Sequence, residues 1–308
     1  MNGVVTPLDQ AMADGAITRR ELKALMRRSD RPGLIHLALW LALILATGSL
    51  VWAAPGWWVI PAMFLHGVVM VHNFALTHEC SHYTAFRTRW LNTLIGHIAG
   101  FLVVVPLKFF RYEHCDHHTF TNQHGKDPEL IDLPISPGRY ALYLSALPYW
   151  WYQYGGVTRR ALGRLTAEER RFIPKVELSA VIWESRIYLA GYLSVLALVL
   201  AGWTAPLFYW WLPLLLGEPV MRFIRMTEHV GRPQVADLEV NTRTNVVSAP
   251  WRFLAWNMNY HAEHHYAASV PFHALHTLHE RLRGHLHVEP GGYFAAHREI
   301  LDAMRARG

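Results

Sequence analysis

Three short histidine clusters are the residues of this chain best suited to chemistry. They read His78-Glu79-Cys80-Ser81-His82, His114-Cys115-Asp116-His117-His118 and His261-Ala262-Glu263-His264-His265. On a helix, residues three and four positions apart share a face, so each cluster would present its histidines together. Neutral imidazole is a common ligand of mid-to-late transition metals. A lone pair of histidines at this spacing is often structural, but three such clusters between apolar stretches predict a metal site.

The clusters hold more imidazoles than one metal ion needs. A structural zinc site has four ligands and no open position. Eight imidazoles suit two metal ions, with positions left open for a small molecule. Zinc has no accessible redox change, so redox work on O₂ would require iron. Two irons can bind and cleave O₂ and remove hydrogen from an unactivated C–H bond.

Acidic residues inside the clusters are candidates for orienting the histidines. Glu79, Asp116 and Glu263 would accept hydrogen bonds from imidazole N–H groups, as carboxylates beside metal-bound histidines do. They are equally consistent with simple surface charges. His229 follows an apolar stretch as His78 does, and it is the best candidate for a ninth ligand.

The two cysteines, Cys80 and Cys115, both lie inside histidine clusters. This placement argues against a disulfide framework and fits a reducing cytosolic environment. Either thiol would be able to ligate a metal, but a small residue filling space beside a crowded site is the simpler interpretation.

The elements that must position the clusters are long and apolar. Hydrophobic residues make up 52% of the chain and charged residues 17%, a balance that indicates a membrane protein. A helix of about 20 apolar residues crosses a bilayer. Four stretches approach that length: 34–54, 58–77, 182–203 and 206–225. We therefore predict an all-α, polytopic membrane protein with four transmembrane helices, forming a single domain over residues 1–308.

The distribution of basic residues predicts the topology. Residues 1–32 are basic, whereas the short turns near Pro55 and Thr204 carry no Lys or Arg. By the positive-inside rule, both termini and all three clusters would face the cytoplasm. Segments 78–181 and 226–308 would then form a cytosolic helical cap that holds a di-metal site. The formal charge of +6 does not indicate nucleic-acid binding, because the basic residues are juxtamembrane.

Two further stretches and one buried charge complete the predicted organisation. Residues 91–107 are apolar but short, which favours a re-entrant or interfacial helix. Residues 140–155 are rich in Tyr and Trp, as in a helix of the headgroup layer. Glu218 falls within the fourth stretch, and an ionisable group at that depth is a candidate for the substrate pocket. The alternative is a local ion pair with Arg222, one turn later.

These motifs resemble the histidine boxes of the membrane fatty acid desaturase family, which includes acyl desaturases and related hydroxylases. The resemblance covers about residues 34–285 and extends to Asn257-Met258-Asn259-Tyr260 and to His124-Gly125-Lys126-Asp127-Pro128. It implies four transmembrane helices, a cytosolic cap and a non-haem di-iron site. Carried onto this sequence, the implied ligands are His78, His82, His114, His117, His118, His261, His264 and His265, with His229 as the further histidine. Asn257 or Asn259 would hold a metal-bound water.

The resemblance also implies O₂ as co-substrate and electrons from ferredoxin, rubredoxin or cytochrome b5 through a reductase. The N-terminal segment is too short for a fused cytochrome b5 domain, so we expect a separate donor. The first interpretation is a fatty acyl (lipid) desaturase in the cytoplasmic membrane. The alternative is a hydroxylase or monooxygenase of the same family that acts on a lipid or a small polar substrate, since the outcome depends on substrate placement. A metal-binding membrane transporter is a distant third, because transporters usually hold their ligands near the bilayer midplane.

Overall fold

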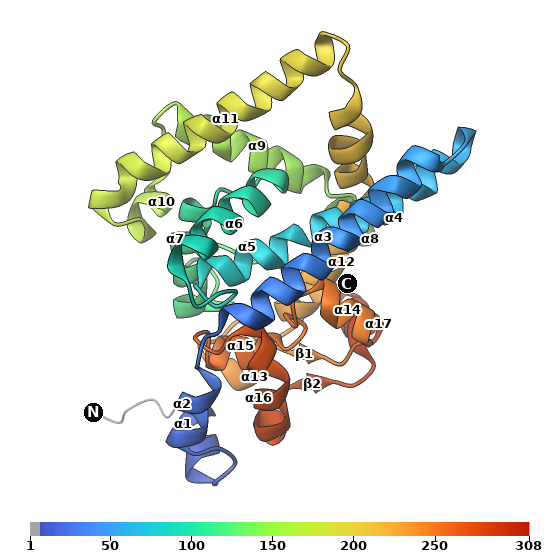
Figure 1. Ribbon diagram of the computed structural model, residues 1–308. Coiled ribbons are helices and arrows are strands. Elements are labelled where there is room, and N and C mark those ends of the chain that lie inside the picture. Colours follow the sequence, from blue (N-terminus) through green and yellow to red (C-terminus); the bar gives the residue numbers. More distant parts are fainter. Residues whose placement is uncertain (1–6, 308) are drawn as a thin grey trace.

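The computed structural model describes residues 7–307 of the 308-residue chain. Helices make up nearly all of its regular structure (Figure 1). Across the described residues, the strands are one short parallel pair, β1 (Thr244–Asn245) and β2 (Val288–Glu289). The prediction of a helical fold is confirmed at this level.

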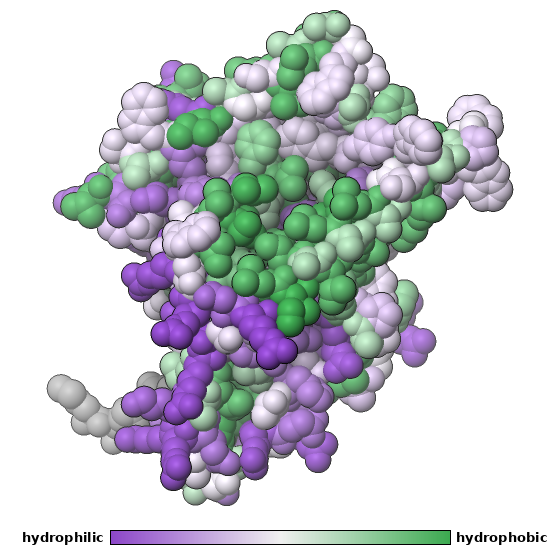
Figure 2. Space-filling model, in the orientation of Figure 1, coloured by the Kyte–Doolittle hydropathy of each residue, from purple (hydrophilic) through white to green (hydrophobic). Residues whose placement is uncertain are grey.

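Three apolar helical segments are long enough to cross a bilayer. They are α3 (Asp30–Ala53), the pair α4 (Val59–Val71) and α5 (Asn73–Ser81), and α11 (Leu178–Leu200). In the most apolar part of α3, only 17% of the residues are buried against the rest of the protein, so most of this surface suits contact with lipid. Figure 2 shows the matching hydrophobic band, which gives way to hydrophilic surface around the N-terminal helices. These segments are the first three predicted spans.

The fourth predicted span, 206–225, corresponds to α12 (Leu212–His229), which follows a π-helical turn, η3 (Leu207–Trp211). Buried Glu218, Arg222 and Arg225 lie along α12. With these charges, α12 is not among the described helices that are apolar enough to count as candidate spans. The bent pair α6 (Arg89–Leu102) and α7 (Leu107–Phe120) passes that test as a unit, with a 95° bend. Such a bend suits the re-entrant segment expected over 91–107.

Helices α4 and α12 make the closest helix contact near the site. A Cβ added to Gly67 would lie 1.9 Å from the carbonyl oxygen of Pro213, and one added to Gly217 would lie 2.2 Å from the Gly67 carbonyl carbon. Small residues at such a crossing let two backbones approach closely. This contact fixes α12 against the helix that leads to the first histidine cluster.

The two short turns that were predicted to share one side of the membrane lie next to each other. Trp52 and Val59, which flank the turn after α3, line one surface depression together with residues 202–205 of the turn after α11. In Figure 1 the hairpin of α3 and α4 ends at the right of the view and the turn after α11 lies at the top. The histidine clusters lie toward the opposite ends of these helices.

The C-terminal helices form a layer in the lower part of the view, beside the long helices (Figure 1). From the C-terminal part come α13 (Leu238–Asn241), α14 (Ala249–Leu254), α15 (His261–Tyr266), α16 (Leu275–Leu282) and α17 (Gly292–Arg307). The N-terminal helices α1 (Pro7–Ala13) and α2 (Arg19–Leu25) pack on this layer, because Ile17 is buried with Leu275 and Leu278. Along the chain, the stretch between the second and third clusters forms α8 (Pro137–Leu144), α9 (Leu147–Ala161) and α10 (Ala167–Phe172).

Short 3₁₀ turns join several of these helices. They are η1 (Gly56–Trp58), η2 (Lys175–Glu177), η4 (Phe272–Ala274) and η5 (Arg283–His285). The aromatic stretch predicted to lie in the headgroup layer falls on α8 and α9, and α9 packs along α11. Trp151 of α9 is 84% exposed, in keeping with an interfacial helix.

Candidate metal centre

The three clusters and His229 converge in one region, although they come from four helices. Cluster one ends α5, cluster two fills the second half of α7, and cluster three forms α15. His229 is the last residue of α12. The i, i+3 and i+4 spacing works as expected, because each helix turns its histidines inward. All nine of the predicted ligand side chains lie in the two groups described next.

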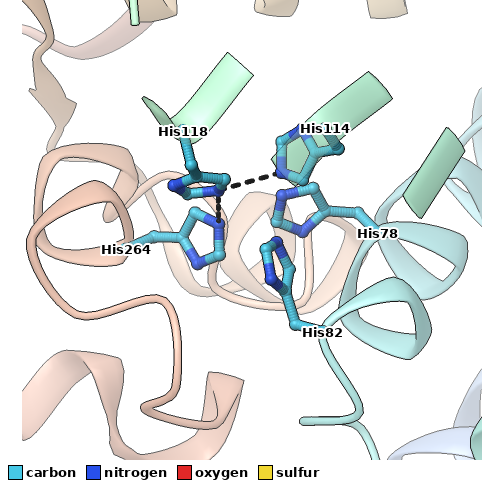
Figure 3. A group of neighbouring side chains, drawn as sticks. All are labelled: His78, His82, His114, His118 and His264. Carbon is cyan, nitrogen blue, oxygen red and sulfur yellow. Dashed lines mark hydrogen bonds between the residues drawn. The ribbon is translucent and has the colours of Figure 1, made fainter. Parts of the chain in front are cut away.

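The first group has five histidines, each with a ring nitrogen within 4.8 Å of the others. Figure 3 shows their rings around a common space, and they are His78, His82, His114, His118 and His264. The second group has four histidines within the same limit: His117, His229, His261 and His265. Helices α7 and α15 supply histidines to both groups. The sequence placed His114, His117 and His118 on one face, and the structure divides that face between two adjacent positions.

Within each group the imidazole Nε2 atoms face one another. In the first group, His118 Nε2 lies 3.1 Å from His114 Nε2 and 3.0 Å from His264 Nε2. In the second, His261 Nε2 lies 2.9 Å from His229 Nε2 and 3.0 Å from His265 Nε2. Buried nitrogens that converge in this way need a cation or a proton between them.

Several of these inward nitrogens have no other partner. The Nε2 atoms of His78, His82 and His117 are buried and make no hydrogen bond to any described residue. Buried polar atoms are nearly always satisfied in folded proteins, so each unsatisfied one requires an explanation. A metal ion in each group would satisfy them, and the donor set of neutral nitrogens suits iron or another mid-row metal. The residues present therefore fit a two-metal site.

The outward nitrogens of four rings are held by hydrogen bonds. His114 Nδ1 donates to Glu129 over 2.6 Å, and His117 Nδ1 donates to Asp127 over 2.8 Å. His229 Nδ1 donates to the Asn241 carbonyl over 3.1 Å. His265 Nδ1 lies 3.1 Å from the hydroxyl of Thr121, which itself donates to a backbone carbonyl. A proton held at Nδ1 leaves Nε2 free to bind a metal.

The electrostatics of the third cluster favour neutral, ligand-competent rings. Burial lowers the pKa of His261, His264 and His265 well below the usual value, and neighbouring imidazoles lower it further. Burial alone would raise the pKa of Asp127. The hydrogen bond and charge of His117, with hydrogen bonds from the Glu129 and Asn122 N–H groups, together outweigh that effect, so the Asp127 pKa is lowered and the carboxylate stays ionised. Neutral rings backed by ionised carboxylates are the arrangement typical of metal-binding histidines.

Of the acidic residues predicted to orient histidines, the structure places only Glu79 beside a histidine of the two groups. A carboxylate oxygen of Glu79 lies 3.7 Å from His78 Nδ1, and another accepts a hydrogen bond of 3.1 Å from the Phe272 N–H. Asp116 instead pairs with Arg171 at 2.8 Å, because a residue next to a ligand on a helix points to another side.

Glu263 also turns away from the rings of its own cluster. It accepts hydrogen bonds from Thr244 and His279 and so fastens α15 to β1 and α16.

The two asparagines predicted as alternatives for holding a metal-bound water, Asn257 and Asn259, differ in their surroundings. Asn257 adopts a left-handed conformation with φ of 60° and donates to the Phe272 carbonyl. The buried Asn259 Oδ1 atom is unpartnered and lines a cavity at the site, so Asn259 is the better-placed of the two.

Glu218 lies on the interior face of α12, where it accepts a hydrogen bond of 2.7 Å from Arg222. This is the local ion pair that the sequence left open as the alternative. Arg222 and Arg225, but not Glu218, line a cavity of ≈ 360 Å³ between α7, α9 and α12. Any effect of Glu218 on that cavity would therefore act through Arg222.

Three carboxylates at the site were missed from the sequence: Asp127, Glu129 and Glu228. Asp127 and Glu129 flank Pro128 in the loop after the second cluster, and their spacing of two was the available signal. That loop folds back behind α7. Arg225 joins Glu129, at 2.8 Å, to Glu228, whose carboxylate lies 3.7 Å from His261 Nε2. Acidic side chains thus back both histidine groups.

The two cysteines and two other histidines lie outside the two histidine groups. Cys80 is buried in the apolar core and Cys115 is exposed, and both are free thiols. Both ring nitrogens of His66 are engaged inside the helix bundle, one with the Thr47 hydroxyl and the other with the Tyr209 carbonyl. His124 is exposed on its loop.

Comparison with known proteins agrees with this geometry. The model of the family described as "Fatty acid desaturase" matches residues 55–296. An sn-1 oleoyl-lipid 12-desaturase of Synechocystis sp. (strain ATCC 27184 / PCC 6803 / Kazusa) is 25% identical over 74% of this chain and 69% of its own length. An sn-1 oleoyl-lipid 12-desaturase of Arthrospira platensis is 22% identical over 72% of this chain and 67% of its own length. An sn-1 acyl-lipid omega-3 desaturase (ferredoxin) of Nostoc sp. (strain 36) is 29% identical over a shorter stretch, 32% of this chain and 30% of its own length.

Proposed function

This chain belongs to the fatty acid desaturase family and is an oxidoreductase, and we propose that it is a di-iron enzyme that uses O₂ to desaturate an acyl chain of a membrane lipid. The observation that carries the proposal is the meeting of nine histidines in two adjacent groups of five and four. One iron would be held by each group. When bound, the two irons supply the O₂ chemistry that removes hydrogen from an unactivated C–H bond.

The protein's own part in this reaction is to fix the ligand nitrogens. Glu129 and Asp127 hold the Nδ1 protons of His114 and His117, and the Asn241 carbonyl holds that of His229. Each ring is thereby kept in one tautomer and one orientation. A site assembled in advance avoids reorganising these groups during the reaction.

The ≈ 360 Å³ cavity beside α7 is the proposed entry for the lipid substrate. Apolar side chains such as Phe109, Phe110 and Val105 line one part, and Phe110 stacks on His114 with ring centroids 5.0 Å apart. Arg222 and Glu113 line another part. An acyl chain would lie along the apolar wall, with its polar end near these charges. Glu218 would contribute by holding Arg222.

We infer that the site faces the cytoplasm, with segments 78–181 and 226–308 as a cap over four membrane helices. The basis is the basic N-terminal segment and the absence of Lys and Arg from the two adjacent turns, 54–58 and 201–206. Electrons would come from a small soluble donor. Ferredoxin is the first choice because a relative carries it in its name, with rubredoxin or cytochrome b5 as alternatives.

The proposal is tested with purified protein loaded with iron and supplied with ferredoxin, a reductase and O₂. The expected result is two irons per chain and a new double bond in the acyl chains of added lipid, identified by mass spectrometry. A hydroxylated product would support the monooxygenase alternative instead. Protein that binds no iron and consumes no O₂ would refute both.

A further inference from the structure

A small cavity of ≈ 30 Å³ adjoins both histidine groups. Its wall includes His78 of the first group and His261 of the second. Glu228 and Arg225 of α12 also line it, and much of the remaining wall is apolar, from side chains such as Phe74. Whatever fills this space therefore adjoins both candidate metal positions.

Four other polar side chains on this wall are left unsatisfied. His72 Nε2, Asn245 Oδ1, Asn259 Oδ1 and the Tyr293 hydroxyl are buried and find no hydrogen-bond partner among residues 7–307. The four residues are at most 7% exposed. Unsatisfied polar atoms that gather on the wall of one cavity indicate an occupant that bonds to them.

The hydrogen bonds that these residues do make identify the missing partner. His72 donates from Nδ1 to a backbone carbonyl over 2.7 Å, which leaves Nε2 as an acceptor. Asn245 donates from Nδ2 to the hydroxyl of Thr227 over 3.0 Å, and Asn259 donates from Nδ2 to the Asn245 carbonyl over 3.0 Å. Both amide oxygens therefore remain as acceptors. With the Tyr293 hydroxyl, the wall offers three acceptors and one group that can donate or accept, so the occupant must donate hydrogen bonds.

We propose that this cavity binds about two water molecules and that they carry protons to the reacting oxygen. One water needs about 10–15 Å³ of free cavity volume, so a cavity of ≈ 30 Å³ admits about two waters and is too small for an acyl chain. Water supplies the donors that the three acceptors lack. It can also accept a hydrogen bond from Tyr293.

The proton-carrying role rests on the proposed function. Desaturation takes two hydrogen atoms from the substrate and two electrons from the donor protein, and O₂ leaves as two waters. The balance requires two further protons from solvent. The cavity waters complete a hydrogen-bonded path from the Tyr293 hydroxyl to the space beside the histidine groups, and that path delivers them.

Hydration is tested by the thermal unfolding of Tyr293→Phe in the full-length protein, with and without iron. The control is Tyr188→Phe, whose hydroxyl donates to the His97 carbonyl over 2.9 Å. Tyr293→Phe should lower Tm by roughly 1–2 °C, as the control does, because both lose a hydrogen bond. In a dry cavity the Tyr293 hydroxyl bonds to nothing, so its removal would leave Tm unchanged or raise it. That result would overturn the proposal.

Proton delivery is tested by the products of O₂ reduction. Tyr293→Phe should release a larger share of the O₂ consumed as hydrogen peroxide and show a larger solvent deuterium isotope effect on desaturation. Tyr188→Phe should match the wild type in both. Unchanged coupling in Tyr293→Phe would overturn the proton path. If Tyr293→Phe lowers Tm as the control does but the wild-type protein desaturates no lipid, the proposed function is refuted and the hydration site stands.

Discussion

The guanidinium of Arg225 donates a hydrogen bond of 2.8 Å to the carboxylate of Glu129, which in turn accepts one of 2.6 Å from His114 Nδ1. The other arm of Arg225 bonds Glu228, whose carboxylate lies 3.7 Å from His261 Nε2. One buried cation thus links a carboxylate behind the first histidine group to a carboxylate beside the second. The two groups therefore share a common electrostatic support.

Glu129→Gln should weaken metal binding by roughly 10- to 100-fold, the usual effect of removing a carboxylate that orients a metal-bound histidine. A neutral amide can present its NH₂ group to His114 and would not fix the tautomer. Iron affinity is measured by competition with a chelator. Glu280→Gln, at an exposed tail position, is the matched control and should bind iron like the wild type. Equal affinity in both variants would show that Glu129 does not support the metal.

His117→Ala should abolish turnover while the protein stays inserted in the membrane. His117 belongs to the group of four, so its loss leaves three nitrogens for that metal. The measurement is desaturated product per chain, together with iron content and the membrane fraction. His124→Ala is the control, because His124 is exposed on the loop after the same cluster. Full activity in His117→Ala would remove this residue from the site.

The helical spacing within each cluster was enough to predict which histidines turn inward. His229 was predicted from a different signal, its place just after an apolar stretch, which it shares with His78. Spacing could not predict how His114 and His117, which share a helix, are divided between two groups. That division depends on where α12 and α15 cross α7, which is a property of tertiary packing.

The carboxylates show where local sequence reasoning was weakest. Asp116 and Glu263 were chosen because they lie inside clusters, but neighbours of a ligand on a helix point away from it. Asp127 and Glu129 reach the rings because their loop folds back, which no periodic pattern signals. The fourth predicted span has no counterpart among the candidate spans of residues 7–307, because Glu218 and the two arginines of α12 interrupt its apolar character.

Gly67→Ala should destabilise the protein strongly. The added Cβ would lie 1.9 Å from the Pro213 carbonyl oxygen, and backbone at a helix crossing cannot yield cheaply. Overpacking of this kind costs about 1–3 kcal/mol or more. Gly155→Ala on α9 is the control, since its Cβ would meet nothing within 4 Å, and it should be neutral or stabilising. The measurement is thermal unfolding in detergent; equal Tm values for the two variants would contradict the close crossing.

The region around α10 should lose stability in acid partly through Glu169. Burial alone would raise the Glu169 pKa, but hydrogen bonds from Arg159 and from the Thr166 N–H outweigh it, so the pKa is lowered in the folded state. A lowered folded pKa means that this contribution is present above the unfolded value, about 4.3, and is lost as pH falls through the folded value. Glu169→Gln should therefore lower Tm at pH 7 and show a smaller further loss toward pH 4. Glu168→Gln, an exposed neighbour, should follow the wild-type pH profile.

Glu218→Gln should change substrate affinity or choice more than iron content. Glu218 holds Arg222 at 2.7 Å, and Arg222 lines the ≈ 360 Å³ cavity and lies over the ring of Tyr149 at 3.9 Å. Without its carboxylate partner, Arg222 would gain freedom to move within the cavity, whereas the histidine groups make no contact with Glu218. The measurements are KM for a series of lipids and iron per chain. Loss of iron with unchanged KM would place Glu218 in support of the metal centre and not of the substrate cavity.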